Sequence, residues 1–113
     1  MIGWLKGEYI DKWQQGSRKG IILSCNGIGY EINLLNRQLL KLNKSKELIF
    51  WVHQIQRDDG YSLYGFDEKS EKEIFRKLIS VSGVGPQIAL SLLEKNEALE
   101  LVIAINNKEI NVL

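Results

Sequence analysis

Two glycines between two helical apolar runs carry the clearest chemistry in this sequence. Gly83 and Gly85 interrupt a pattern of apolar residues that recurs at helical spacing on both sides. Two helices joined by so short a turn form a helix-hairpin-helix, where glycines permit positive φ and a close approach to the backbone. Pro86 suits the first position of the second helix, whose free N–H groups can bind a phosphate oxygen. The turn predicts binding of a nucleic-acid backbone without choice of sequence, and an ordinary glycine turn is the alternative.

The composition is that of a small globular protein. The chain has 113 residues, of which 44% are hydrophobic and 26% charged, and its net charge is +1. So low a net charge excludes a uniformly basic protein that coats nucleic acid. Any DNA affinity must therefore come from local binding sites, whose effect is multiplied when several copies of the chain assemble. The single cysteine, Cys25, excludes an internal disulfide framework and a multi-cysteine metal site. Neither a signal peptide nor an apolar run of about 20 residues is found, so we expect a cytoplasmic protein without a membrane partner.

The first part of the chain has short apolar segments separated by turn residues, a pattern typical of β-structure. Asn26-Gly27 is the strongest short hairpin signal, because a type I′ turn needs positive φ at both central residues. Leu35, Leu39 and Leu42 at helical spacing predict a short helix before the fourth strand. Three strands, a short helix and a two-stranded hairpin are the order of a five-stranded OB-fold barrel. The strands are expected over residues 2–10, 20–25, 30–34, 47–55 and 61–66, with residues 14–19 as a polar lead-in to the second.

The last third of the chain predicts helices. Ser70 and Glu73 form a capping-box pattern at the start of the helix that leads into the glycine turn. A third helix is expected to end near Asn106, and Asn106 with Glu109 resembles the start of a further one. Because that helix would stop on bare apolar residues, we expect the parent protein to be longer. The predicted domains are an OB-fold over residues 1–66 and an incomplete helix-hairpin-helix domain over residues 67–113.

Together these pieces resemble the RuvA family of bacterial Holliday-junction-binding proteins over essentially the whole chain. The resemblance rests on Met1-Ile2-Gly3 with Leu5 and Gly7, Gly27-Ile28-Gly29-Tyr30-Glu31, His53 with Arg57-Asp58-Asp59, Leu63-Tyr64-Gly65-Phe66, Phe75-Arg76-Lys77-Leu78-Ile79, and Ser82-Gly83-Val84-Gly85-Pro86 with Ala89-Leu90.

The resemblance implies a non-catalytic DNA-binding subunit. RuvA-like proteins form a four-fold homotetramer that holds a four-way junction open and square in recombination and repair. Their C-terminal domain engages a RuvB-like hexameric ATPase that drives branch migration, and a RuvC-like resolvase is a further partner. This sequence holds only the first of the family's two hairpins. The resemblance implies no catalytic residue, metal or cofactor.

The same resemblance implies roles for particular residues. Ser82, Gly83, Val84, Gly85 and Gln87 match the family's first phosphate-binding hairpin. The family commonly has lysine at the position of Gln87, so one charge-assisted phosphate contact is missing here.

Asp58 and Asp59 match the family's acidic pin at the junction centre, where they repel phosphates. Without the resemblance, Asp59-Gly60 would be a plain type I′ turn with Asp58 as a solvated neighbour. Arg57 beside the pin can hold a phosphate or pair with a carboxylate, and the sequence does not choose between them.

Several alternatives remain open at this point. The chain could be a general single-strand or duplex DNA-binding module of a repair protein, or a structural oligomerisation module. A repair glycosylase would need a lysine or aspartate nucleophile after the hairpin, and no lysine follows Pro86 before Lys95. His53 is expected to be a packed histidine, and Lys41, Lys44 and Lys46 a solvated loop. Five aromatic residues are expected to lie in the barrel core or at subunit contacts, and the alternative is that they stack on bases, as aromatic residues of OB-folds do: Trp4, Trp13, Trp51, Tyr61 and Tyr64.

Overall fold

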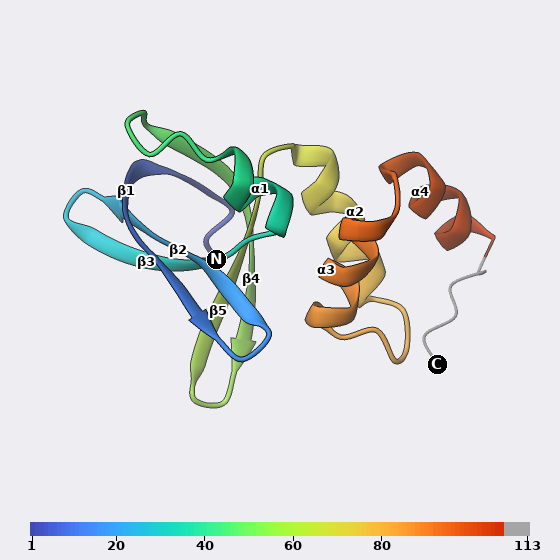
Figure 1. Cartoon of the computed structure of the whole chain (residues 1–113). Helices are drawn as coiled ribbons and strands as arrows, with labels where there is room; N and C mark the ends of the chain where they lie inside the picture. Colours follow the sequence, from blue (N-terminus) through green and yellow to red (C-terminus); the bar gives the residue numbers. More distant parts are fainter. Residues whose placement is uncertain (108–113) are drawn as a thin grey trace. The chain divides into compact units, whose positions relative to one another are not determined.

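The computed structural model describes residues 1–107, and the chain divides into two compact units, residues 1–68 and the residues from Lys69 onward. The first unit is a closed barrel with the strand order β1-β2-β3-β5-β4 (Figure 1). All neighbouring strands are antiparallel except β3 and β5, which run parallel. This architecture confirms the predicted five-stranded barrel. Its elements are β1 (Trp4–Gln15), β2 (Arg18–Cys25), β3 (Ile28–Asn33), α1 (Asn36–Lys41), β4 (Leu48–Arg57) and β5 (Gly60–Phe66).

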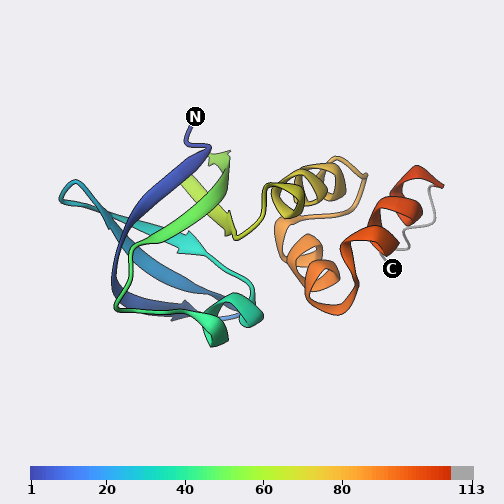
Figure 2. The ribbon, with the colours of Figure 1, turned by 90° about the horizontal axis from the view of Figure 1, so that it is seen from above.

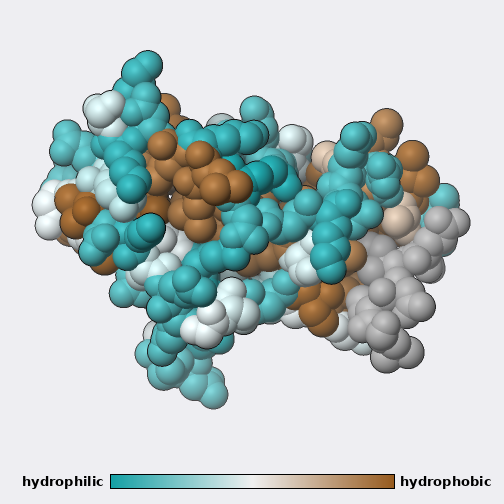
Figure 3. Space-filling view, in the orientation of Figure 1, coloured by the Kyte–Doolittle hydropathy of each residue, from teal (hydrophilic) through white to brown (hydrophobic). Residues whose placement is uncertain are grey.

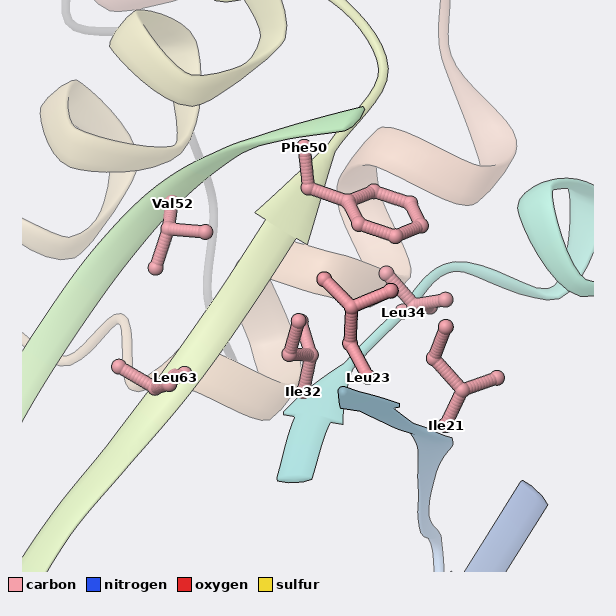
Figure 4. Packing of buried hydrophobic residues seen from close by; sticks show 7 residues of the cluster. All are labelled: Ile21, Leu23, Ile32, Leu34, Phe50, Val52 and Leu63. Carbon is pink, nitrogen blue, oxygen red and sulfur yellow. The ribbon is translucent and has the colours of Figure 1, made fainter. Parts of the chain in front are cut away.

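The barrel interior is filled by side chains from alternating strand positions. Because successive side chains point to opposite faces of a strand, β2 and β3 each send every second residue inward. Phe50 is the largest side chain of this cluster and is 1% exposed. Figure 4 shows the seven buried residues that make up the cluster: Ile21, Leu23, Ile32, Leu34, Phe50, Val52 and Leu63.

Removing the Phe50 ring is expected to destabilise the barrel. Phe50→Ala leaves a cavity in the close-packed interior and should lower the free energy of unfolding by about 3–5 kcal/mol. The neighbouring Ile49 is 49% exposed, so Ile49→Ala should cost much less. Urea denaturation of both variants measures the difference. Equal losses for the two variants would contradict the assignment of Phe50 to the core.

The turn between β2 and β3 is the predicted type I′ hairpin. Asn26 has φ +52° and Gly27 has φ +83°, as that turn requires. The following helix α1 is held by Gln38, a buried residue whose Oε1 accepts a hydrogen bond from the Leu35 backbone N–H at 2.7 Å. Gln38 is the third residue of α1, and its side chain accepts the hydrogen bond from the N–H group just before the helix. This bond fixes where α1 begins.

The predicted polar lead-in over residues 14–19 is wrong. Strands β1 and β2 pair through Gln14–Lys19 and Gln15–Arg18, so that only Gly16 and Ser17 form the turn. Gly16 has φ +62°, which suits the first central position of a type II′ hairpin turn. The outer part of the β1–β2 hairpin carries polar residues on both faces, so it lacks the alternation of apolar and polar residues by which strands are recognised in a sequence.

Up to residue 107, the second unit contains three helices, which follow one another along the chain (Figure 2). They are α2 (Lys69–Ile79), α3 (Pro86–Lys95) and α4 (Ala98–Asn106). The predicted cap at Ser70 is wrong, because α2 already begins at Lys69 and places Ser70 inside the helix. The further helix start expected from Asn106 and Glu109 lies outside the described residues. Among residues 1–107 no helix combines the length and apolar character needed to cross a membrane.

Candidate nucleic-acid interface

The turn between α2 and α3 is wound tightly from the end of one helix to the start of the next. The N–H groups of Ser80, Val81 and Val84 each donate to the carbonyl three residues earlier, at 3.0–3.2 Å. Gly83 has φ +85°, a left-handed conformation that glycine adopts without steric cost. The Val84 side chain is 6% exposed. Val84 therefore anchors the turn through both its buried side chain and its N–H group.

Several backbone N–H groups of this turn are without a partner. Within the described chain, those of Ser82, Gly83 and Gly85 donate to no carbonyl or side chain. Gly85 is the N-cap of α3 and offers no side-chain cap, so the N–H groups of Gln87 and Ile88 are also open. The positive end of the helix dipole lies at the same place. The turn is thus arranged to receive an anion from outside.

The two glycines of the turn play different structural parts. Gly85 has φ −87°, which any residue can adopt, so the expected need for positive φ applies only to Gly83. A Cβ built on Gly85 would meet no atom within 4 Å. A side chain at this position would therefore project into open space beside the free N–H groups. The absence of a side chain there keeps the approach to those groups clear.

Basic side chains lie on α2 immediately before this turn. Burial, and then the positive charges of Arg76 and Lys69, lower the pKa of the Lys72 amine, while Glu73 opposes them. Arg76 and Lys77 line a shallow hollow together with Glu73 and Ser80 at the C-terminal end of the helix. The sequence pattern alone does not single out these cations, although their spacing of three and four residues places them on one side of a helix.

The turn between β4 and β5 carries the two acidic residues. Arg57 and Gly60 are paired across the strands, so Asp58 and Asp59 are the two central residues of the turn. Neither has positive φ, whereas Gly60 after them has φ +142°, so the type I′ interpretation of Asp59-Gly60 is wrong. Both carboxylates are exposed and, among the described residues, take part in no ion pair or hydrogen bond. The tip of this hairpin is hydrophilic and extends from the barrel (Figures 1 and 3).

Arg57 does not pair with either of these carboxylates. Its Nη2 donates a hydrogen bond to the Tyr64 hydroxyl oxygen at 3.2 Å. Tyr64 is fully buried, so the guanidinium group is held back along the strand, away from the two acids at the tip.

The aromatic residues of the barrel differ in their exposure, and Trp4 lies directly opposite Trp51 on the neighbouring strand. Tyr64 is buried, and the Nε1–H of Trp13 donates to the Ile21 carbonyl oxygen at 3.1 Å. The Arg18 guanidinium lies over the Trp13 ring, 6.0 Å from its centroid. Trp4 and Tyr61 are about half exposed, and His53 is half-buried opposite Tyr64.

Comparison with known proteins places these features in a family. The family model described as "RuvA N terminal domain" matches residues 1–65. A protein of Prochlorococcus marinus (strain SARG) is 59% identical over 110 residues, which cover 97% of this chain and 50% of that protein. A protein of Synechococcus sp. (strain CC9605) is 42% identical over 113 residues, which cover 100% of this chain and 53% of that protein. Both are named "Holliday junction branch migration complex subunit RuvA". The chain spans about half the length of the curated relatives it matches, and it belongs to the RuvA N-terminal domain family.

Proposed function

We propose that this chain is the non-catalytic, DNA-binding part of a subunit that recognises four-way junctions. In this proposal the assembled subunit holds the junction open and square, and a separate RuvB-like ATPase drives branch migration in recombination and repair. The names of the relatives support this role. The observation that carries it is the turn before α3, where unpaired N–H groups surround a position left open by Gly85.

The two units have separate tasks in this proposal. The helical domain, residues 67–113, binds DNA phosphates through the turn formed by Ser82, Gly83, Val84, Gly85 and Gln87. Val84 anchors this turn, and the other four residues supply the backbone N–H groups. The barrel domain, residues 1–66, presents Asp58 and Asp59 to the centre of the junction, where two negative charges from each subunit keep duplex DNA out. Arg57 supplies a phosphate contact at the edge of that centre. Four copies assembled as a homotetramer multiply each weak contact.

A comparison of three DNA substrates tests the proposed function. The 113-residue protein is titrated against a four-way junction, a linear duplex and a single strand of equal length, with light scattering to count subunits. We expect the junction to bind most tightly and the bound form to contain four subunits. Equal affinity for the three substrates would contradict junction recognition. A preference for the single strand would favour a general single-strand-binding module instead.

Restoring a lysine at position 87 is expected to strengthen binding. Gln87→Lys adds a cation in the first turn of α3, beside the proposed phosphate site. One additional phosphate contact should steepen the slope of log affinity against log salt by about 0.9 and raise affinity several-fold at low salt. Gel-shift titration at several salt concentrations measures both quantities. As a control, Ser91→Lys adds the same charge to the exposed middle of α3 and should change the slope less.

A further inference from the structure

The outer part of the β1–β2 hairpin is a basic ribbon that the proposed function leaves unused. We use the name basic ribbon for residues 12–20. Three of its residues are positively charged and none is negatively charged, although the net charge of the whole chain is only +1. Three of the nine lysines and arginines of the barrel therefore lie on this one hairpin, with no acidic residue among them.

A bulge directs this ribbon. The β1–β2 register shifts between Tyr9 and Asp11, and a bulge bends the strand that contains it. Beyond the bend, β1 and β2 run to the same end of the barrel as the turn that carries Asp58 and Asp59 (Figure 1). That end is hydrophilic on the face shown in Figure 3. Both hairpins thus meet whatever approaches the barrel from this end.

Arg18 is held in place but lacks an acceptor. Trp13 is fixed by its hydrogen bond to the Ile21 carbonyl, and the Arg18 guanidinium lies over its ring. The Nε of Arg18 is buried and has no hydrogen-bond partner, whereas its two terminal nitrogens are not buried and no residue in the described part of the chain accepts a hydrogen bond from them. A buried donor without a partner costs free energy, and a phosphate accepts the fork of arginine donors well. The terminal N–H groups of Arg18 are therefore open to an anionic acceptor from another molecule.

The cross-strand register distributes the cations over both faces of the ribbon. Trp13 lies opposite Gly20 and Gln15 opposite Arg18, so the Trp13 and Arg18 side chains share one face. Lys12 and Lys19 lie on the other face by the same register. A two-stranded ribbon fits the major groove of B-DNA, where phosphates flank it on both sides. The exposed side chains around the turn belong to Gln14, Gln15 and Ser17, rather than to the apolar and aromatic residues that mark the core of a protein interface.

We propose that the basic ribbon is a second DNA-backbone contact, made by Lys12, Arg18 and Lys19, with Arg18 stacked on Trp13 as its fixed centre. This proposal rests on the proposed DNA-binding function. The contact belongs to the barrel and is separate from the phosphate site before α3. It gives the barrel an attraction for a DNA arm at the end where its own acidic turn repels phosphates.

The salt dependence of binding tests the ribbon. Lys12→Gln, Arg18→Gln and Lys19→Gln are combined in the 113-residue protein, and junction and duplex affinities are measured over a series of KCl concentrations from about 0.05 to 0.3 M. Loss of three phosphate contacts should reduce the slope of log affinity against log salt by about 2.7, and the affinity at about 0.1 M salt by about 100-fold. The matched control combines Lys41→Gln, Lys44→Gln and Lys46→Gln. It removes the same charge from the end of α1 and the segment that follows it, away from the β1–β2 turn (Figure 1), and should leave the slope near that of the unmodified protein.

A single conservative change separates the charge of Arg18 from its shape. Arg18→Lys keeps the positive charge but loses the planar fork and its stacking on Trp13. We expect a nearly unchanged salt slope and a several-fold lower affinity. If the unmodified protein binds DNA and the triple ribbon variant keeps its slope and affinity, the ribbon proposal is wrong and the proposed function stands. If the unmodified protein binds neither junction nor duplex DNA, both proposals are wrong.

Discussion

Replacing Asp58 and Asp59 together by asparagine is expected to abolish most of the preference for four-way junctions over linear duplex. Asparagine keeps the size of each side chain and its compatibility with the turn, but removes both negative charges. Like charges brought together at an interface cost several kcal/mol, so their removal should make duplex binding easier by about 1–3 kcal/mol. The junction-to-duplex affinity ratio should then fall by about 10- to 100-fold while total DNA affinity stays equal or rises.

Two features of the acidic turn support this expectation. Both carboxylates are exposed, and neither takes part in an ion pair or hydrogen bond within the described chain, so their field is not cancelled locally. The arginine that precedes them in the sequence, Arg57, is bound to the Tyr64 hydroxyl instead. The control removes two exposed carboxylates from the barrel wall by Glu8→Gln and Glu31→Gln, which should leave the ratio unchanged. Complete loss of DNA binding in the Asp58→Asn, Asp59→Asn protein would show that the acids attract DNA, directly or through a bound cation.

Placing an aspartate at position 85 is expected to strengthen helix α3 and weaken DNA binding at the same time. Gly85 is the N-cap of α3, and aspartate is among the most favourable N-cap residues because its carboxylate accepts hydrogen bonds from the N–H groups of the first turn. Those N–H groups are the proposed phosphate donors. Gly85→Asp would occupy them from within the chain and add a like charge. Each lost charge-assisted hydrogen bond is worth about 1.5–3 kcal/mol, so affinity should fall about 10- to 100-fold.

Measuring stability and affinity on the same protein makes this prediction sharp. The open space around Gly85 and its ordinary φ mean that the variant should fold, with a free energy of unfolding equal to or slightly above that of the parent. Ser91→Asp adds the same charge to the exposed side of α3 and should reduce affinity much less. Unchanged DNA affinity in Gly85→Asp would place the phosphate contact somewhere other than this turn.

The barrel was predictable where residue type and backbone conformation agree. The Asn26-Gly27 turn, the short helix before β4 and the order of the elements along the chain followed from periodicity and turn chemistry, and the five-stranded barrel was predicted correctly. The β1–β2 hairpin was missed because its outer part is polar on both faces and its turn is Gly16-Ser17. The acidic turn was assigned the wrong type, because Asp59-Gly60 resembles a type I′ pair while the strands instead close at Arg57 and Gly60.

The candidate site was predictable as a set of residues but not as a geometry. The glycine turn was found from sequence, yet only the structure separates Gly83, which needs its positive φ, from Gly85, which leaves space. The hydrogen bond that fixes Arg57 joins it to Tyr64, seven positions along the chain and beyond the turn. The lack of a hydrogen-bond partner for the Arg18 Nε likewise depends on how the guanidinium packs over the Trp13 ring. Such features arise from tertiary packing, which a local pattern does not report.

The closure of the barrel has a consequence for how the protein is made. The first four residues of β1 pair with the start of β4, from Trp4–Trp51 to Gly7–Leu48, and the Ile2 N–H donates to the Gln54 side chain across 52 positions. Contacts between such distant positions form late, because the entropy of closing a long loop is lost before these contacts can stabilise the fold. On the ribosome, the opening residues of the chain therefore stay without their partners until β4 has emerged. The β1–β2–β3 meander can assemble earlier, and the seam between β1 and β4 then closes the barrel around it.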